Sequence, residues 1–491
     1  MADLPDRELY LPEKYSHLTP HEYVKTLIAF VKQYDHLINI HIVNFITTDQ
    51  WQLLDPEWQT ALLPTDVNNE DDWIQQLINI TSGNTENVGI LCICIPHHMQ
   101  HSNHRQYDIG YMARFIERIC SAYTGYGVTT RIPFRLLNDV DVCQLEQDYQ
   151  RGMNDKKIHE VGFMSTLIDR VATRRNIDSV MDLGAGQGYL ARAIAWKYGL
   201  RVLAVDGSEV QTCGAKRIDH NILKRTSKQN GQVHHVTEMV TPENISGILS
   251  NWQTSNGQHK DTMEPWLLCG LHACGDLSSL MLRLFAESDE MGSLVNVGCC
   301  HHFLTQEEGF PMSSFVNKEL GYQQTSTAHM LACQTPSRWT DRAEETLKSF
   351  EHHFFRALLQ HIMVEKGLTP VDKAPIVGRL NKKKDFISFP IYVRAALKRF
   401  GLPEDTISAQ EAEAYYEKYK NHKQIDKQIA VLWTIRVLLA PVLESIILMD
   451  RWLYLKESLL QYPDTKTKGV WMWPLFDPII SPRNTVIVAS K

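Results

Sequence analysis

The chain has 491 residues, more than one ordinary hydrophobic core accommodates, so we expect two or three domains. Its apolar share of 43% and charged share of 22% are those of a globular protein. The net charge of −7 shows that the molecule as a whole is not a polycation. A nucleic-acid partner would therefore have to bind at a local basic patch.

The first residues are charged and lack the apolar core of a signal peptide, and we expect the ten cysteines to be thiols in a cytoplasmic or nuclear protein. The apolar stretch Val431–Leu455 contains four charges: Arg436, Glu444, Asp450 and Arg451. Each charge at a bilayer centre would cost about 2.5–3.5 kcal/mol. We therefore predict a buried helix pair broken at Pro441 and no membrane span.

Residues 1–150 are predicted to form a mainly helical accessory domain, a candidate surface for a protein partner. Apolar residues recur there at three- and four-residue steps over His21–Ile46 and Tyr111–Tyr123. An alternating run, Val88–Ile95, suits a strand or a buried helix turn. The histidine-rich segment Pro96–His104 matches no standard zinc spacing, and we interpret it as a polar loop.

Residues 151–340 alternate between predicted helices and strands. The strands are expected over Ser179–Gly184, Leu200–Asp206, the run VHHVT, Pro265–His272 and Ser293–Cys299. Nearly continuous apolar strands that alternate with helices specify an α/β, Rossmann-like parallel sheet covered on both faces. Residues 341–462 are predicted to be a helical insertion, and residues 463–491 to return to the sheet through a final strand.

A glycine-rich segment, DLGAGQGYLA over Asp182–Ala191, lies between a predicted strand and a predicted helix. Gly184, Gly186 and Gly188 form a G-x-G-x-G turn. Glycine suits such a turn because the backbone bends tightly and a ligand can approach without meeting a Cβ. Nucleotide dehydrogenases use a related loop, so the turn alone leaves the cofactor open.

Three acidic residues narrow the choice of cofactor. Asp182 ends the first strand, where it can meet the amino-acid end of a cofactor, and Asp206 ends the second, where it can bind both ribose hydroxyls. This pattern resembles class I S-adenosylmethionine (SAM)-dependent methyltransferases over about Ile158–Leu304. Glu238, with Thr237 as its rival, falls where the adenine amino group would be bound; a charge at the start of the next helix is the alternative.

Reactive side chains follow the fourth and fifth predicted strands. Because ligands bind beyond the carboxyl ends of parallel strands, we expect these residues to face the methyl group. They are His272, Cys274, Asp276, Cys299, Cys300, His301 and His302. We take His272, Asp276, Cys299, His301 and His302 as the candidate catalytic residues.

Several motifs indicate a family. The segments KKIHEV (Lys156–Val161), DLGAGQGYL, YGLRVLAVDGS, LHACGDL, VGCCHHFL and ISPRN closely resemble the methyltransferase-like protein 25 family, which includes a form called ribosomal RNA adenine dimethylase domain-containing. The histidine–cysteine–glycine and C-C-H-H segments also resemble the tRNA acceptor-stem 2′-O-methyltransferase family. The first resemblance covers most of the chain and implies a methyltransferase fold. The second favours RNA as the substrate.

Three interpretations of the reactive cluster stay open. In the first, His301, His302 or Asp276 is a general base. In the second, a cysteine is a covalent nucleophile, as in pyrimidine C5 methylation, although the proline usual in such enzymes is absent. In the third, zinc is bound by Cys274, Cys299, Cys300 and either His301 or His302, although adjacent cysteines are awkward tetrahedral ligands. Small thiols packed under the sheet are the structural alternative, and we assign no metal ligands from the sequence.

The segment Gly378–Phe400 carries seven basic residues against one acid. Its Phe386, Phe389 and Tyr392 could stack on bases. We predict that the substrate is bound by Lys382, Lys383, Lys384 and Arg394, with Arg338 and Arg483 as further candidates. A solvated basic face around a buried aromatic seam is the alternative.

The sequence as a whole therefore predicts a SAM-dependent methyltransferase that acts on tRNA or rRNA. No [D/N]-P-P-[F/Y/W] motif follows the fourth strand, which argues against methylation of adenine N6. A methyltransferase of proteins or small molecules is one alternative. A catalytically silent scaffold that keeps the fold is the other.

Overall fold

The computed structural model describes residues 4–12, 15–63, 70–79, 149–224, 231–255, 264–477 and 479–491. These residues form two compact units. The sheet unit takes the described residues up to Phe30, residues 149–333 and Pro441–Lys491; the helical unit takes the described residues from Val31 to Asn79 and Gln334–Ala440. The predicted accessory segments Val88–Ile95, Pro96–His104 and Tyr111–Tyr123 lie outside the described residues.

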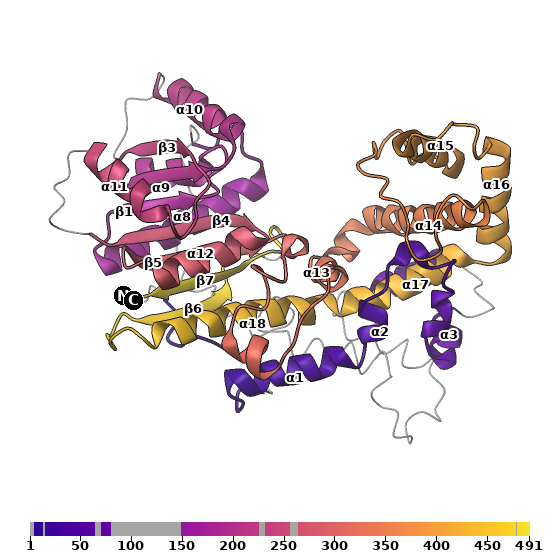
Figure 1. The fold of residues 1–491 in the computed structure, drawn as a ribbon, viewed down its shortest axis with the longest axis horizontal. Helices are drawn as coiled ribbons and strands as arrows, with labels where there is room; N and C mark the ends of the chain where they lie inside the picture. The colour runs from indigo at the N-terminus through magenta and orange to yellow at the C-terminus, as the bar shows by residue number, and fades with distance from the viewer. Residues whose placement is uncertain are drawn as a thin grey trace. The chain divides into compact units, whose positions relative to one another are not determined.

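The sheet unit is built around a seven-stranded sheet with the strand order β3-β2-β1-β4-β5-β7-β6 (Figure 1). The strands are β1 (Ser179–Leu183), β2 (Arg201–Asp206), β3 (Val233–Thr237), β4 (Trp266–Cys274), β5 (Met291–Cys299), β6 (Gly469–Pro474) and β7 (Thr485–Ser490). The first five pair in parallel, and β7 runs antiparallel to both β5 and β6. The predicted return of the C-terminal run to the sheet is confirmed as β7.

Burial explains why these segments become strands. β1, β6 and β7 are buried at every position, as expected for strands covered on both faces. The register places Asp182 of β1 opposite Ala204 of β2 and Cys269 of β4. The carboxyl ends of β1, β2, β4 and β5 therefore reach the same edge of the sheet, where doubly wound folds bind their ligands.

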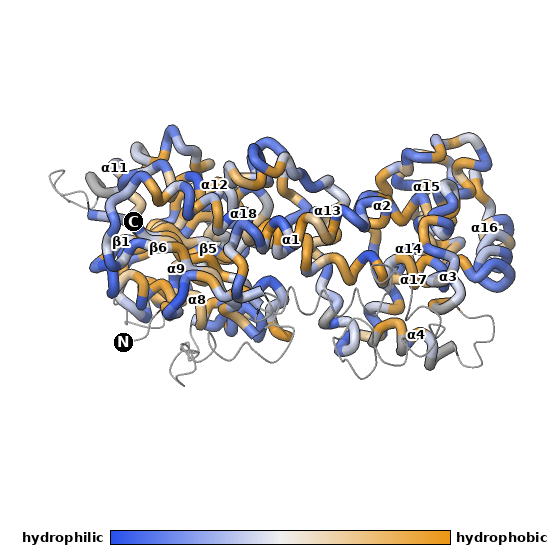
Figure 2. Tube along the Cα trace, turned by 90° about the horizontal axis from the view of Figure 1, so that it is seen from below, coloured by the Kyte–Doolittle hydropathy of each residue, from blue (hydrophilic) through white to orange (hydrophobic). Residues whose placement is uncertain are grey.

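Helices cover both faces of the sheet (Figures 1 and 2). The helices that alternate with the strands are α8 (Asp155–Arg175), α9 (Tyr189–Tyr198), α10 (Glu209–Leu223), α11 (Ile245–Ser255) and α12 (Asp276–Glu287). Apolar residues of α8 and α9 pack against Val180, Val202 and Val295 in one core cluster. Met281 and Phe285 of α12 are also fully buried. The predicted α/β class I methyltransferase architecture is thus confirmed.

The rest of the sheet unit is helical. It comprises α1 (Pro20–Lys32, which continues two residues past the unit boundary), η8 (His301–Phe303), η9 (Phe315–Glu319), α13 (Ser326–Ala332) and α18 (Ala440–Leu459). α18 is fixed by a buried carboxylate, Asp450, which accepts hydrogen bonds from the Ser313 hydroxyl and from the amides of Met312 and Ser313. One of the charges that interrupt the apolar run thus anchors the loop after β5.

The helical unit contains short helices from the N-terminal part of the chain and a longer set from its second half. They are α2 (Asp35–Ile38), η2 (Ile42–Asn44), η3 (Gln50–Leu53), α3 (Pro56–Leu62), α4 (Glu70–Asn79), η10 (Pro336–Arg338), η11 (Thr340–Arg342), α14 (Ala343–Glu365), α15 (Phe389–Phe400), α16 (Ala409–Glu417), η12 (Lys418–His422) and α17 (Ile425–Leu438). Arg436 of α17 is buried and donates to the carbonyls of Leu37, Ile38 and Ile40. This cation satisfies carbonyls at the end of α2.

The helical stretch Ile425–Leu459 is long and apolar enough to cross a membrane, judged by length and composition. Of its most apolar window, 89% is buried inside the protein, and the core helix of a globular protein passes the same test. α17 ends at Leu438 and α18 begins at Ala440, next to Pro441, where we predicted the helix pair to break.

Candidate active site

The glycine turn and the end of β2 form one hydrogen-bonded structure. The amide of Gly186 donates to Asp206 Oδ2 at 2.8 Å, and the amide of Ser208 donates to Oδ1 at 2.8 Å. The Asp206 carboxylate therefore fixes the β1–α9 turn and its own loop at once. Such charge-assisted bonds hold an acceptor in place for a ligand's hydroxyls.

The turn also leaves room for a ligand. Gly186 has φ +55°, and a Cβ added there would meet nothing within 4 Å, so open space lies beside its backbone. Gly188 has φ +70°, and a Cβ there would lie 2.6 Å from Cε1 of His235. Both positions favour glycine because of their positive φ, and Gly188 is also restricted by its contact with His235. The open space beside Gly186 allows the close approach of a cofactor.

Asp182 is a buried carboxylate at the end of β1. It is 2% exposed, and its Oδ2 atom has no hydrogen-bond partner among the described residues. Burial, with a smaller contribution from the nearby Asp206 carboxylate, raises the pKa of Asp182 to about 7. A buried carboxylate without a full set of partners suits a cationic ligand group such as the ammonium group of an amino acid. Together with the space at Gly186, this oxygen fits the predicted cofactor.

The residues predicted to bind adenine lie just beyond β3. Thr237 is the last residue of β3 and pairs with Asp206 in the register of β2. The amide of Glu238 donates to the Asp206 carbonyl at 3.2 Å, and both Thr237 and Glu238 are exposed. The structure therefore brings the predicted ribose and adenine residues to adjacent strand ends, while the choice between Glu238 and Thr237 stays a prediction.

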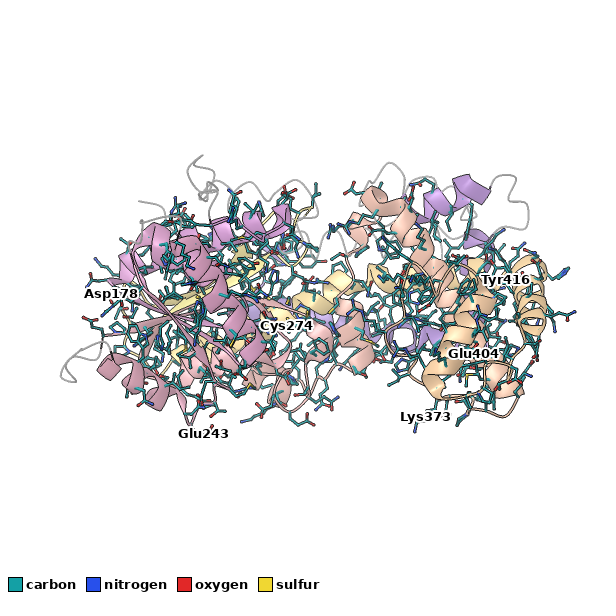
Figure 3. All side chains as sticks on the ribbon, turned by 90° about the horizontal axis from the view of Figure 1, so that it is seen from above. Asp178, Glu243, Cys274, Lys373, Glu404 and Tyr416 are labelled. Carbon is teal, nitrogen blue, oxygen red and sulfur yellow. The ribbon has the colours of Figure 1, made fainter. Side chains whose placement is uncertain are left out.

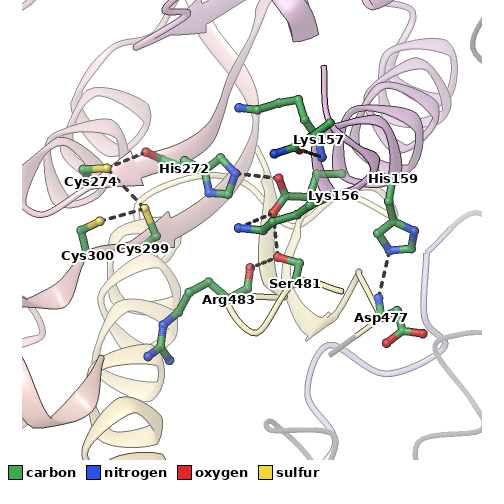
Figure 4. Close-up of polar contacts among 12 residues, drawn as sticks. Lys156, Lys157, His159, His272, Cys274, Cys299, Cys300, Asp477, Ser481 and Arg483 are labelled. Atoms are coloured by element: carbon green, nitrogen blue, oxygen red, sulfur yellow. Dashed lines mark hydrogen bonds and ion pairs between the residues drawn. The ribbon is translucent and has the colours of Figure 1, made fainter. Parts of the chain in front are cut away.

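His272 forms a dyad with a buried glutamate on α8 (Figure 4). Its Nε2 lies 2.8 Å from Glu160 Oε2, and Glu160 is 1% exposed. The Ser481 hydroxyl donates to the other oxygen of Glu160 at 2.7 Å. Burial alone would raise the pKa of Glu160, but the hydrogen bonds from His272 and Ser481 lower it below its usual value. Glu160 is thus an ionised acceptor that orients the imidazole.

The backbone at His272 is irregular in the way that functional sites often are. The pairing of β4 with β5 shifts between Leu271 and Ala273, and His272 between them has φ +63°. A non-glycine residue in this region is strained by roughly 1–3 kcal/mol. The irregularity marks the point at which β4 places a partly exposed imidazole, 24% accessible, at the sheet edge.

The other predicted catalytic residues are placed differently. Both oxygens of Asp276 accept from Thr305, one from its amide and one from its hydroxyl, each at 2.9 Å. His301 is fully buried 3.5 Å from Glu444, and burial lowers its pKa to about 4. His302 is exposed, with Nδ1 3.4 Å from the Cys333 sulfur. Asp276 and His301 therefore have structural contacts in the described chain, and their catalytic roles stay predictions.

Three thiols meet at the ends of β4 and β5 (Figure 4), and Cys274 is the one of them that Figure 3 labels. Cys274 and Cys299 are partners in the strand register, and their sulfurs lie 3.3 Å apart. The Cys299 and Cys300 sulfurs lie 3.6 Å apart. The hydrogen bond from Cys299 lowers the pKa of Cys274 to about 6, and the same contact raises the pKa of Cys299. The sequence prediction that these residues gather at one edge is therefore matched by the coordinates.

The predicted substrate residues belong to the helical unit. Lys382, Lys383, Lys384 and Arg394 are all exposed. The aromatic residues interleaved with them are not free to stack: Phe389 and Tyr392 are each 1% exposed, and Phe386 packs on His352 at a ring distance of 3.9 Å. The expectation that Phe389 and Tyr392 stack on bases is wrong, because both rings are buried on α15, and the alternative of a buried aromatic seam fits these two. Phe386 is half-buried.

Sequence reasoning missed Glu160 and Ser481 as site residues. Both lie in motifs that carry the family resemblance, KKIHEV and ISPRN, but no role was assigned to them. The two residues are 321 positions apart along the chain, and Glu160 is 112 positions from His272. A histidine at the end of the fourth strand was the available signal that a buried acid should be sought among the motif residues.

Comparison with known proteins shows what this chain is similar to. Residues 156–307 match a family model described as a methyltransferase domain. The chain is 28% identical over 467 residues to a probable methyltransferase-like protein 25 from Homo sapiens, covering 69% of this chain and 75% of that protein. It is 25% identical over 616 residues to the Mus musculus protein of the same description, covering 98% of each.

One solved structure is also similar, coclaurine N-methyltransferase bound to N-methylheliamine and SAH. It shares 14% identity, covers 86% of this chain and 94% of its own, and has a TM-score of 0.20. We base the assignment on the domain match, the strand order and the glycine turn with its acids. The chain is a SAM-dependent methyltransferase of the class I fold, similar to the methyltransferase-like protein 25 family as its motifs predicted.

Proposed function

We propose that this methyltransferase acts on RNA, and that His272 accepts the proton of the acceptor group. SAM, when bound, supplies an electrophilic methyl group. Asp182, Gly186 and Asp206 would hold the cofactor at the ends of β1 and β2. The task left to the protein at the ends of β4 and β5 is to orient a hydroxyl or amine and remove its proton.

The His272–Glu160 dyad suits that task. Because ionised Glu160 can only accept, it favours the tautomer in which His272 Nε2 carries the hydrogen. His272 Nδ1 is then the nitrogen with a lone pair, and it can take a proton. A positioned general base of this kind contributes about 10²–10⁴-fold to a rate.

The surface of the helical unit is the observation that carries the RNA proposal. Asn381 Oδ1 accepts from the amides of Lys383 and Lys384, and the amide of Asn381 donates to Asp385. This turn displays Lys382–Lys384 to solvent. Exposed Arg394, Lys398 and Arg399 follow on α15. A segment with this many exposed cations on a chain of net charge −7 is suited to phosphates.

A pocket of the same unit supplies the stacking surface that α15 lacks. Two indole rings, Trp339 and Trp433, line it together with Arg338 and Arg342. Aromatic faces beside guanidinium groups bind unpaired bases and the phosphates next to them. Arg338, which the sequence singled out, thus lies beside partly exposed tryptophans.

The test is methylation of total RNA by the full chain with tritium-labelled SAM, followed by ribonuclease or protease digestion. We expect ribonuclease-sensitive label that falls at least tenfold in the triple variant Lys382→Gln/Lys383→Gln/Lys384→Gln. Because each phosphate contact to single strands contributes about 0.7 to the slope of log affinity against log salt, this variant should lower that slope by about 2.

The matched control is the double variant Lys348→Gln/Lys373→Gln, which removes exposed lysines outside the basic turn. It should methylate RNA as the wild type does. Label found only in protein or in small molecules, with no dependence on the three lysines, would refute RNA as the acceptor.

A further inference from the structure

The thiols at the ends of β4 and β5 have a geometry that methyl transfer does not require. Cys274 and Cys299 face each other across the strand pair, and Cys300 follows in the left-handed region with φ +52°. All three sulfurs lie within 4.8 Å of one another. The unusual backbone at Cys300 lets two adjacent cysteines place their sulfurs 3.6 Å apart, which an extended strand does not do.

These separations match metal ligation better than a disulfide. A disulfide bond is about 2.05 Å long. Tetrahedral thiolates at about 2.3 Å from zinc lie about 3.8 Å from each other. The Cys274–Cys299 and Cys299–Cys300 sulfur distances, 3.3 and 3.6 Å, lie slightly below that value. The largest sulfur–sulfur distance in the group is at most 4.8 Å, which allows a separation above it. These three sulfurs need to move by about an ångström or less to bind one ion.

A fourth thiol, Cys333, caps the end of α13. Its sulfur lies 3.4 Å from Nδ1 of His302, which follows Cys300 by two residues in the turn after β5. Cys333 is not one of the three sulfurs that lie within 4.8 Å of one another, so it has to approach them to complete a tetrahedral set.

Buried positive charge supplies an independent indication. Arg451 is fully buried, and its three guanidinium nitrogens have no hydrogen-bond partner among the described residues. Its Nη1 lies beside the backbone of Gly298, where an added Cβ would approach it to 2.4 Å. A buried cation without hydrogen bonds is costly unless a negative charge lies near it. The charges that act on Arg451 are those of Asp450, Cys299, Asp276 and Glu444, and Arg483 is paired with Glu444 at 2.6 Å. Four thiolates around a divalent ion carry a net charge of −2, which Arg451 would partly offset.

We propose that Cys274, Cys299, Cys300 and Cys333 bind one zinc ion. Zn²⁺ displaces the four thiol protons to solvent and ties the ends of β4 and β5 to the end of α13. Since His272 lies two residues before Cys274, the ion would also fix the strand end that carries the dyad. Thiolates held by zinc are not available as covalent nucleophiles. The proposal is independent of the acceptor assigned above.

The experiment is elemental analysis of the full chain purified in reductant without chelator, then loaded with Zn²⁺ alone. We expect about one zinc per chain. The double variant Cys299→Ser/Cys300→Ser should lower the zinc content at least tenfold, and Cys333→Ser should weaken zinc at least tenfold in competition with a chelating dye. Cys213→Ser, an exposed thiol on α10, is the matched control and should keep the zinc.

A measurement on the wild type guards against variants that fail to fold. Zinc should slow alkylation of the exposed Cys274 at least tenfold while leaving Cys213 unchanged, and removal by a chelator should restore the rate. SAM binding reports that the protein is folded. A folded chain that takes up no zinc, or a Cys274–Cys299 disulfide under reducing conditions, would overturn the site. Cys333→Ser with wild-type affinity would overturn the four-cysteine set.

Discussion

The two halves of the sheet's carboxyl edge are built in different ways. On the cofactor side, Gly186 and Asp206 are joined by a hydrogen bond over only twenty residues, within one strand–turn–helix–strand segment. On the acceptor side, His272 depends on Glu160 and Ser481, which come from α8 and from the loop before β7. A local site is visible in the sequence as one motif, whereas a site assembled from distant segments is divided among several motifs whose connection the sequence does not show.

The largest effect should come from the acceptor side. His272→Asn should lower kcat by about 10²–10⁴-fold, because it removes the only proton acceptor that we assign. Affinity for SAM, measured by calorimetry, should stay within about twofold if the two halves are independent. His220→Asn, an exposed histidine on α10, is the control. Equal losses of kcat and of SAM affinity would contradict the separation of the two halves.

Asp182 on the cofactor side should make stability depend on pH. Its pKa is raised to about 7 in the folded state from 3.8, so the folded state holds the proton more tightly than the unfolded state does. That stabilisation is complete below about pH 4 and is lost as the pH rises through 7. Since asparagine does not ionise, Asp182→Asn should gain about 3 kcal/mol of unfolding free energy relative to wild type between pH 5 and pH 8.

Denaturant unfolding without SAM at the two pH values measures this difference. Lys157 and Asp206 are the other charges acting on Asp182, so buffers of equal ionic strength are needed. A difference that does not change with pH would show that Asp182 ionises normally in the folded protein.

Asp206→Ala should weaken SAM binding about a hundredfold, which corresponds to about 2.8 kcal/mol. The substitution removes the acceptor of two backbone amides together with the group predicted to bind ribose. Calorimetry against Asp178→Ala, a 63% exposed aspartate just before β1, gives a matched comparison. Wild-type affinity in Asp206→Ala would mean that the glycine turn is not the cofactor site.

The smallest effect should come from Ser481, which we regard as a positioning residue. Ser481→Ala removes one hydrogen bond to ionised Glu160, worth about 1 kcal/mol, and should lower kcat about fivefold with little change in KM. One lost donor should also raise the apparent pKa of the dyad in the pH–rate profile. Ser481→Thr, which keeps a hydroxyl, should restore part of the rate. An unchanged profile would leave Ser481 with a structural role only.

The parallel strands could be predicted closely because burial on both faces leaves a run of apolar residues in the sequence. VHHVT, for example, is β3, and the predicted Leu200–Asp206 differs from β2 by one residue. β6 was not predicted as a strand, although GVWMWP is buried throughout. Its apolar run is short and ends in proline, and no helix separates it from β7, so the strand–helix alternation does not mark it.

The basic segment Gly378–Phe400 shows what residue composition alone cannot predict. The lysines of Lys382–Lys384 are exposed, as their charge predicts. The rings of Phe389 and Tyr392 are buried, although the same segment was expected to display them. Helical spacing in α15 puts those two rings on one side, three residues apart, and Arg394 is exposed on the same helix. Basic and aromatic residues that alternate along the sequence therefore do not have to lie together on the surface.

The sequence by itself determined the class I sheet, the glycine turn with Asp206, and the gathering of histidines and cysteines after the fourth and fifth strands. Only the tertiary structure decided which of these residues have partners. It joined His272 to Glu160, buried His301 against Glu444, and brought Arg451 beside Gly298, the neighbour of Cys299 in β5. The physical reason is that periodicity records whether a residue is buried, but not which residue from a distant segment is buried against it.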